Sequence, residues 1–120
     1  MIINLPFPPT SNTYWRNIVM GGRPRTLISK KGREYTVLVG HVVDNDFGDL
    51  APMDGRLEVI VHLYPPDKRK RDLDNYLKSL FDAITKTQKI WVDDEQIDYI
   101  AITRGEKCEG GRAVVTIREL

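Results

Sequence analysis

The most regular pattern of hydrophobic and polar positions lies in the second half of the chain. Five apolar residues there recur at spacings of three and four: Leu73, Leu77, Leu80, Phe81 and Ile84. They form one apolar stripe with a period of about 3.6, as in an amphipathic helix. The pattern predicts a helix that begins at Asp72 and ends at the polar segment KTQK, residues 86–89.

A second helix is predicted from residue 30 to about residue 45, with Ser29 as its cap. Its apolar positions also lie three and four residues apart: Tyr35, Leu38, Val39, Val42 and Val43. Two internal glycines and several valines make this pattern weaker than the first. His41 lies on the apolar side of this helix, so we interpret it as a core residue and not as a ligand.

Four segments have the composition of strands: residues 2–5, 57–64, 97–103 and 113–117. Residues 90–92 form a further short apolar run, and His62 falls within a strand. Residues 6–28 are predicted to be a long loop with its most flexible point at GGRPR, residues 21–25. The order β, α, β, α, β, β predicts an α+β (mixed α/β) fold, in which one sheet packs against two helices in a single domain spanning 1–120.

Composition bounds the class of protein. The 120 residues, 41% of them apolar, fit one hydrophobic core, and 18 lysines and arginines against 17 acids give no global preference for nucleic acid. The lone Cys108 excludes a disulfide framework. No signal peptide or run long enough to span a membrane is seen, so we expect a soluble, cytoplasmic protein with no membrane partner.

Charge is segregated along the chain, most sharply at DKRKRDLDN, residues 67–75. Asp72 and Asp74 lie at the start of the predicted helix that follows the strand over residues 57–64. Asp72 alone is explained equally well as a helix cap, whose side chain accepts from free backbone N–H groups. The pair followed by Asn75 favours a metal site, because Mg²⁺ is bound through oxygen by one or two carboxylates together with water and phosphate.

A third carboxylate is available in VDDEQ, residues 92–96. A helix from Asp74 to Lys86 rises about 18 Å, and the eight steps from Lys86 to Asp94 can span roughly 26–29 Å. The chain can therefore return Asp94 to the start of the helix. Alternatively, these acids simply make a polar turn.

Basic residues around the acids are candidates for contacts with DNA. Lys78 lies one turn after Asp74; it forms either an ion pair with Asp74 or a contact that stabilises charge on a phosphate. The cations Lys68, Arg69, Lys70 and Arg71 form either a solvated loop or a phosphate-binding run. The loop adds cations and aromatic side chains suited to distorted nucleic acid: Tyr14, Trp15, Arg16, Arg23 and Arg25. Trp15 could equally anchor the loop on the core.

Three segments, in order along the chain, resemble the RusA family of Holliday junction resolvases of phages and prophages. They are LPFPPTSNTYWR (5–16), KRKRDLDNYLKSLFDAI (68–84) and IWVDDEQI (90–97), and the likeness covers essentially the whole chain. The resemblance implies a homodimeric, Mg²⁺-dependent endonuclease, with Mn²⁺ as an alternative ion. Such an enzyme binds four-way junction DNA and makes paired symmetric nicks in recombination and repair.

The resemblance also implies roles for individual residues. The essential carboxylates correspond to Asp72, Asp74 and Asp94, with Asp93 beside them, and the basic residues to Arg71 and Lys78. Two rival interpretations remain: a less selective nuclease of flaps and forks, and a DNA-binding module without catalysis.

Overall fold

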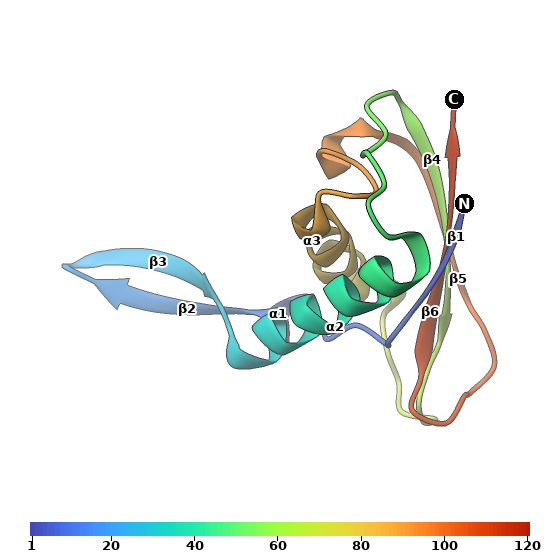
Figure 1. Cartoon of the computed structure of the whole chain (residues 1–120). Coiled ribbons are helices and arrows are strands. Elements are labelled where there is room, and N and C mark those ends of the chain that lie inside the picture. Colours follow the sequence, from blue (N-terminus) through green and yellow to red (C-terminus); the bar gives the residue numbers. More distant parts are fainter.

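A mixed four-stranded sheet forms one layer of the molecule (Figure 1). The computed structural model describes residues 1–120. The strand order across the sheet is β1-β6-β4-β5, with bounds β1 (Ile2–Leu5), β4 (Leu57–Tyr64), β5 (Ile97–Arg104) and β6 (Arg112–Glu119). β6 is antiparallel to both neighbours, whereas β4 and β5 are parallel, so the connection between them crosses the sheet through a helix.

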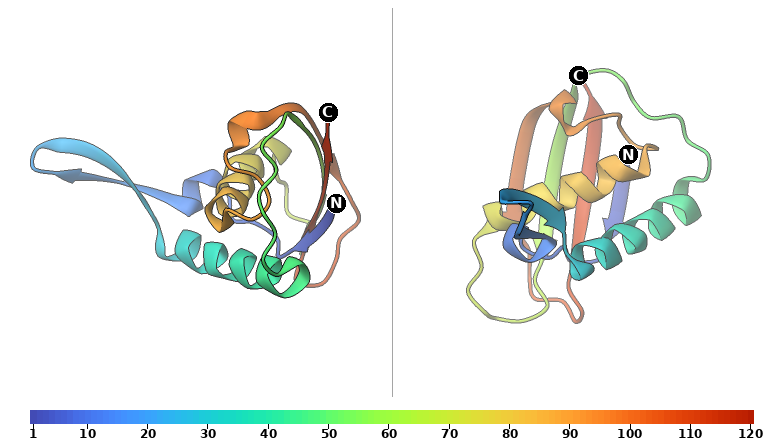
Figure 2. Two further views of the ribbon diagram at one scale, coloured as in Figure 1. Left: turned by 45° about the horizontal axis from the view of Figure 1, so that its top comes forward. Right: turned by 90° about the vertical axis from the view of Figure 1, so that its left-hand side faces the viewer.

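Two helices, α2 (Lys30–Phe47) and α3 (Leu77–Thr87), cover one face of this sheet (Figure 2). Buried and half-buried residues alternate along β4, as expected for a strand with one face on a core. Its buried residues meet those of the other strands and helices in a single cluster, which includes Val61, Val115, Val39, Leu80 and Ile84. This arrangement confirms the predicted α+β class and the two predicted helices.

The ends of the helices follow local sequence signals. Ser29 caps α2, because its hydroxyl accepts a hydrogen bond from the Gly32 N–H at 3.0 Å. α3 is preceded by the 3₁₀ turn η1 (Leu73–Tyr76) and is followed by Gln88, which caps it in a left-handed conformation with φ 54°. No helix of the chain is both long and apolar enough to cross a membrane.

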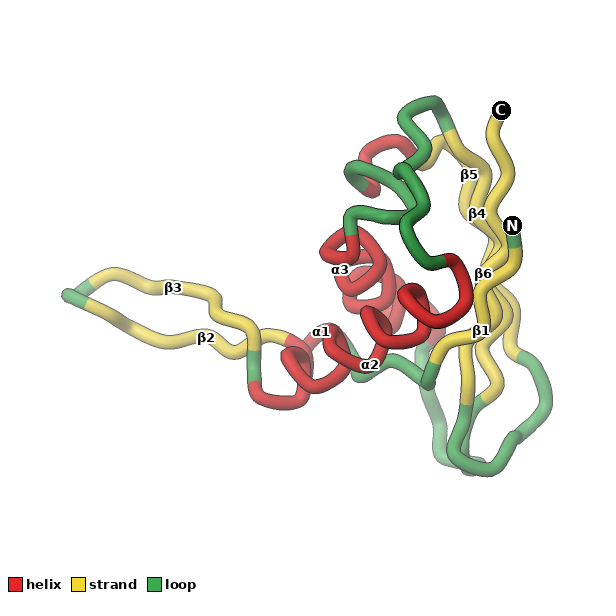
Figure 3. The backbone as a smooth tube through the Cα atoms, viewed as in Figure 1, coloured by secondary structure: helices red, strands yellow, loops and turns green.

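The prediction of a long loop over residues 6–28 is wrong. This segment forms the short helix α1 (Ser11–Tyr14) and a hairpin of β2 (Trp15–Met20) and β3 (Arg23–Ile28), which projects from the body (Figures 1 and 3). Gly21 and Gly22, with φ 57° and 76°, make the two-residue turn that such a hairpin needs. Neither strand rests on the core for most of its length, so its side chains show no apolar alternation.

The two histidines differ. His41 is exposed, so its interpretation as a core residue is wrong: α2 buries the face that carries Tyr35, Val39 and Val43 instead. His62 is half-buried in β4, and its Nδ1 is hydrogen-bonded to the Thr103 hydroxyl of the neighbouring strand. The interpretation of His62 as a satisfied sheet residue is confirmed.

Candidate active site

Asp72 and Asp74 project from the start of η1 with no protein partner for either carboxylate. Both residues are exposed, and neither side chain makes a hydrogen bond or an ion pair. Asp72 has an extended backbone (φ −89°, ψ 122°), and its main-chain oxygen accepts from the Asn75 N–H at 3.1 Å. Because Asp72 makes no side-chain capping bond, the helix-cap alternative does not explain it. The carboxylates of Asp72 and Asp74, two residues apart in the chain, are thus both free of protein partners.

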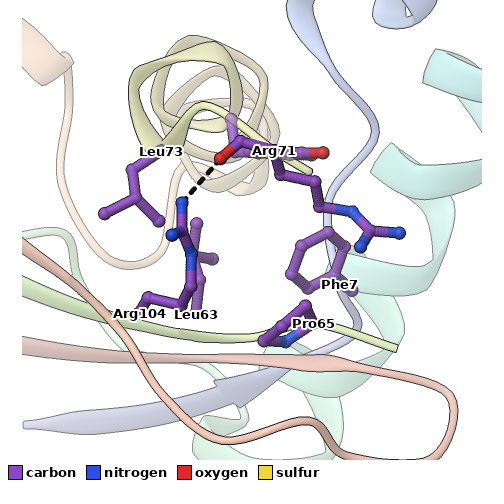
Figure 4. A pocket seen from close by; sticks show the side chains of 7 residues that line it. Phe7, Leu63, Pro65, Arg71, Leu73 and Arg104 are labelled. Carbon is purple, nitrogen blue, oxygen red and sulfur yellow. Dashed lines mark hydrogen bonds between the residues drawn. The ribbon is translucent and has the colours of Figure 1, made fainter. Parts of the chain in front are cut away.

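The residues between the two acids explain why both acids face outward. Leu73 and Tyr76 line a small apolar pocket together with Phe7 and Leu63 (Figure 4). The Phe7 and Tyr76 rings meet edge to face, with 5.0 Å between centroids. Burial of these apolar side chains fixes η1 on the body, which leaves the polar side chains of the turn in solvent.

Lys78, one turn further along, makes no ion pair with Asp74. Its Nζ lies 5.2 Å from the centroid of the Trp15 ring. Trp15 is half-buried and packs against the core, so its interpretation as an anchor is confirmed. The Lys78 charge therefore stands over an aromatic ring and not over a carboxylate, so the ion-pair alternative for this residue is wrong.

Lys78 and the base of the hairpin line one polar groove of about 780 Å³. Its lining is mostly polar: Ser11, Asn12, Trp15, Arg16, Asn17, Thr26 and Lys78. The Ser11 hydroxyl donates to the main-chain oxygen of Asn75 at 3.1 Å, which ties α1 to η1. This bond links α1, which lines the groove, to η1, the turn that carries Asp74. Asn75 contributes to this link through its backbone.

The register of the hairpin places three predicted arginines on one face. Arg16 is paired with Leu27, Ile18 with Arg25 and Met20 with Arg23. Since side chains alternate along a strand and directly paired residues share a face, Arg16, Arg23 and Arg25 all point to the same side. Trp15, Asn17 and Thr26 point to the other side, and together with Arg16 they line the groove. All three arginines are exposed.

The basic run is organised by Asp67. The Arg71 Nη1 donates to Asp67 Oδ1 at 2.7 Å, and the Arg69 Nε lies 3.5 Å from Asp67 Oδ2. The Arg71 hydrogen bond, more than any other contact, lowers the pKa of Asp67 to about 2. The Arg71 side chain is only 14% exposed, so it closes the loop and does not present free charge. Lys68, Arg69 and Lys70 are exposed.

Two further cations, which sequence reasoning missed, join this run. A hollow of about 430 Å³ is lined by the basic run on one side and by Arg104, Gly105 and Lys107 on the other. Arg104 ends β5 and Lys107 lies in the loop that follows. No local signal marks them, because the parallel pairing of β4 and β5 brings residues 104–107 beside the loop after β4.

Asp94 does not join Asp72 and Asp74. The chain contains no group of three or more histidine, cysteine or acidic side chains placed to hold a metal. Asp94 begins the short turn η2 (Asp94–Gln96), where burial and the neighbouring carboxyls of Asp93 and Asp82 raise its pKa. The expected convergence of three carboxylates is thus wrong for the single chain, and the roles of Asp93 and Asp94 as ligands stay predictions.

Packing of the segment before β5 explains where Asp94 lies. Trp91 is fully buried, and its indole donates to the Thr85 hydroxyl of α3 at 2.6 Å. The buried Gln96 side chain accepts from the Val92 and Asp93 N–H groups and donates to the Met53 and Gly55 oxygens, each at 2.9 Å. These bonds fix η2 beside α3, so Asp94 lies there and not at the start of η1.

Asp82 is a third residue near the candidate site that sequence reasoning missed. Its carboxylate accepts from the Tyr14 hydroxyl at 2.5 Å and lies 3.1 Å from the Lys86 Nζ. Burial, followed by the hydrogen bond to Asp82, raises the pKa of Tyr14. The available signal was a spacing of four residues through Asp74, Lys78, Asp82 and Lys86, which places alternating charges along one side of η1 and α3.

Comparisons with known proteins agree on one family. The model of the family described as Endodeoxyribonuclease RusA matches residues 6–118. The crossover junction endodeoxyribonuclease RusA of Escherichia coli (strain K12) is 37% identical over 121 residues, which cover 98% of this chain and 93% of the relative. The RusA proteins of Shigella sonnei (strain Ss046) and Enterobacteria phage 82 are 38% and 36% identical with the same coverage.

Proposed function

Because the chain belongs to the RusA family of endodeoxyribonucleases, we propose that it is a divalent-metal-dependent endonuclease that resolves four-way DNA junctions by paired nicks. The observation that carries the proposal is the pair of carboxylates without protein partners, Asp72 and Asp74. They stand at the start of η1, which leads directly into α3, the helix that carries Lys78 into the groove. The exposed cations Lys68, Arg69 and Lys70 lie just before these acids in the chain.

The residues present suit Mg²⁺, with Mn²⁺ as an alternative ion. Both ions accept carboxylate oxygen, and Mg²⁺ commonly needs only one or two protein carboxylates when water and substrate phosphate complete its shell. Asp72 and Asp74 would hold the ion. When bound, it would supply an activated water and neutralise charge on the scissile phosphate. Asp94, with Asp93 beside it, is proposed as a further ligand that approaches once DNA and metal are bound.

The chain's own cations bind and orient the DNA. Lys78 is exposed and unpaired, so it is free to contact a non-bridging phosphate oxygen and stabilise the charge that develops there. Lys68, Arg69 and Lys70 would neutralise phosphates on one side of the site, and the arginine face of the hairpin would do so on the other. Arg71 supports this contact indirectly, through its bond to Asp67. Asn75 orients the turn.

A homodimer would place two such sites on opposing strands, because a two-fold interface matches a two-fold junction. Exposed apolar side chains on the hairpin and on α2 support such an interface: Val19, Met20, Leu27, Val37 and Leu38. Leu38→Asp tests this proposal by light scattering. A wild-type chain that is monomeric at micromolar concentration contradicts it.

The decisive experiment compares nicking of matched four-way junction, flap and duplex DNA by the wild type and by Asp74→Asn, in Mg²⁺ and in chelator. We expect junction nicking to fall at least 100-fold in Asp74→Asn, while junction binding persists. Asp46→Asn is the control, because Asp46 is exposed on α2 and has no ion pair. Undiminished cleavage by Asp74→Asn contradicts the metal site, and equal cleavage of flaps and junctions contradicts resolvase activity.

A further inference from the structure

Arg104 makes a single long-range contact that reaches the candidate metal site. Its Nη2 donates a hydrogen bond of 2.6 Å to the main-chain oxygen of Arg71, 33 residues away in the sequence (Figure 4). A charged donor makes this bond stronger than one between neutral groups. The Arg104 side chain forms no ion pair with any carboxylate, so the Arg71 carbonyl is its one hydrogen-bond partner.

The carbonyl that Arg104 binds belongs to the peptide that joins Arg71 to Asp72. On the other side of Asp72, its own carbonyl accepts from the Asn75 N–H at 3.1 Å. The backbone of Asp72 is therefore held on both sides, whereas its carboxylate is free. Because an aspartate carboxylate is only two bonds from its Cα, the orientation of these two peptides limits it to the few directions that its staggered rotamers allow.

The residues on either side are anchored by their side chains, Arg71 through its bond to Asp67 and Leu73 in the apolar pocket, but the carbonyl between them has one protein partner. The segment between β4 and η1 has no regular secondary structure, and Arg104 supplies the only protein hydrogen bond to the Arg71 oxygen. The pocket beneath has a volume of about 10 Å³, which barely admits one water molecule, and it is lined mainly by apolar side chains. The bond lies at the surface, so without Arg104 water replaces the guanidinium at the Arg71 carbonyl, and no protein group then holds this peptide in one orientation.

We propose that Arg104 is a positioning residue, which aims the Asp72 carboxylate at the metal through the Arg71 carbonyl. The inference rests on the proposed function, because it assumes that Asp72 is a metal ligand. Groups that orient metal ligands from outside the coordination shell typically change metal affinity 10–100-fold when they are removed. Arg104 is such a group, even though its charge belongs to the cationic hollow.

The test measures binding of Mn²⁺ to the protein–junction complex by electron paramagnetic resonance, with Arg104→Met as the main variant. We expect its Mn²⁺ dissociation constant to rise about 10-fold or more. The Mg²⁺ concentration that gives half-maximal nicking should rise by a similar factor, while maximal nicking at saturating Mg²⁺ recovers. Arg104→Lys keeps one donor and should fall between the two proteins.

Lys107→Met is the matched control, because Lys107 lines the same hollow and makes no bond to the Arg71–Asp72 peptide. It removes the same charge, so its effect should appear in the salt dependence of junction binding and not in Mn²⁺ affinity. If Arg104→Met melts below the assay temperature, Arg104→Gln replaces it, since the shorter glutamine amide falls short of the carbonyl and should give the same loss.

The outcomes separate this inference from the proposed function. If Asp72→Asn abolishes Mn²⁺ binding but Arg104→Met binds Mn²⁺ as the wild type does, the positioning role is overturned and the metal site stands. If Arg104→Met and Lys107→Met weaken Mn²⁺ binding equally, the effect is one of charge and the inference is also overturned. If Asp72→Asn itself leaves Mn²⁺ binding unchanged, the metal site of the proposed function is wrong.

Discussion

Lys78 offers the sharpest separation of catalysis from folding. Its Nζ lies 5.2 Å from the Trp15 ring centroid and makes no ion pair. Lys78→Met keeps the length of the side chain and removes its charge. If Lys78 stabilises the transition state, the nicking rate should fall 10²–10³-fold, which corresponds to roughly 2.7–4 kcal/mol of barrier. The lost cation–π contact is worth only about 0.5–1 kcal/mol at an exposed position, or about 2–6 °C in melting temperature.

Lys86→Met is the matched control on the same helix. Lys86 also lies over an aromatic ring, 5.5 Å from the Tyr14 centroid, and it pairs with Asp82 at 3.1 Å. Its ion pair adds roughly 0.3–0.5 kcal/mol, so its removal should destabilise the fold at least as much as that of Lys78. Nicking by Lys86→Met should nevertheless stay within about twofold of the wild type.

The assay is single-turnover nicking of a synthetic four-way junction at saturating enzyme and Mg²⁺, with thermal melting followed by circular dichroism. Saturation removes any effect of the charge on DNA affinity, so the rate reports the chemical step. Equal rates for the two variants would refute the assigned role of Lys78. A rate loss that disappears at lower temperature, where both variants are folded, would assign the effect to stability instead.

Three further predictions concern the fold and the basic run. Gly32→Ala should destabilise the protein by about 1–3 kcal/mol, because the new Cβ would collide with the main-chain oxygen of Tyr14. Gly40→Ala in the same helix meets no atom and should stabilise the protein by about 0.5–1 kcal/mol. Chemical denaturation measures both free energies of unfolding. Replacing Lys68, Arg69 and Lys70 together by alanine should lower the log–log salt slope of junction binding by about 2–3, and an unchanged slope would exclude phosphate contacts. Asp67→Asn should destabilise the protein at neutral pH, and the loss of stability should shrink as pH falls from about 4 toward 2. Arg71 holds the pKa of Asp67 at about 2, so the stabilisation that the wild-type carboxylate provides is lost as it becomes protonated. Urea unfolding of both proteins from pH 7 to 2 measures this difference in stability.

Elements that bury an apolar face were predictable from the sequence. The stripe of α3 and the alternation of β4 both reflect contact with one core, so periodicity alone locates them. The hairpin could not be predicted in this way, because its strands lie in solvent and do not pack on the core, so their apolar residues show no periodicity. Its one local signal was Gly21–Gly22, a two-residue turn flanked by segments of equal length.

The chemical parts of the site were predictable to the extent that they are contiguous. Asp72, Asp74 and Lys78 lie on one turn and the helix that follows it, so spacing fixes their relation. Arg104 reaches the same place only because β5 is parallel to β4 and ends beside the loop that β4 leads into. A crossover connection separates two parallel strands in the sequence, so no spacing along the chain predicts which residue of β5 lies at the site.

For the third carboxylate, Asp94, the distance that the linking chain can span does not determine where the residue lies. Chain length allows Asp94 to return to the start of η1, but length sets only an upper bound on distance. The actual position follows from burial of Trp91 and from the four hydrogen bonds of Gln96, which fix η2 beside Asp82. A carboxylate that becomes a ligand must therefore be brought to the metal by binding, and Gln96→Leu, which frees η2, should alter Mg²⁺ dependence without touching Asp72 or Asp74. Unchanged Mg²⁺ dependence in this variant would remove Asp94 from the proposed set of ligands.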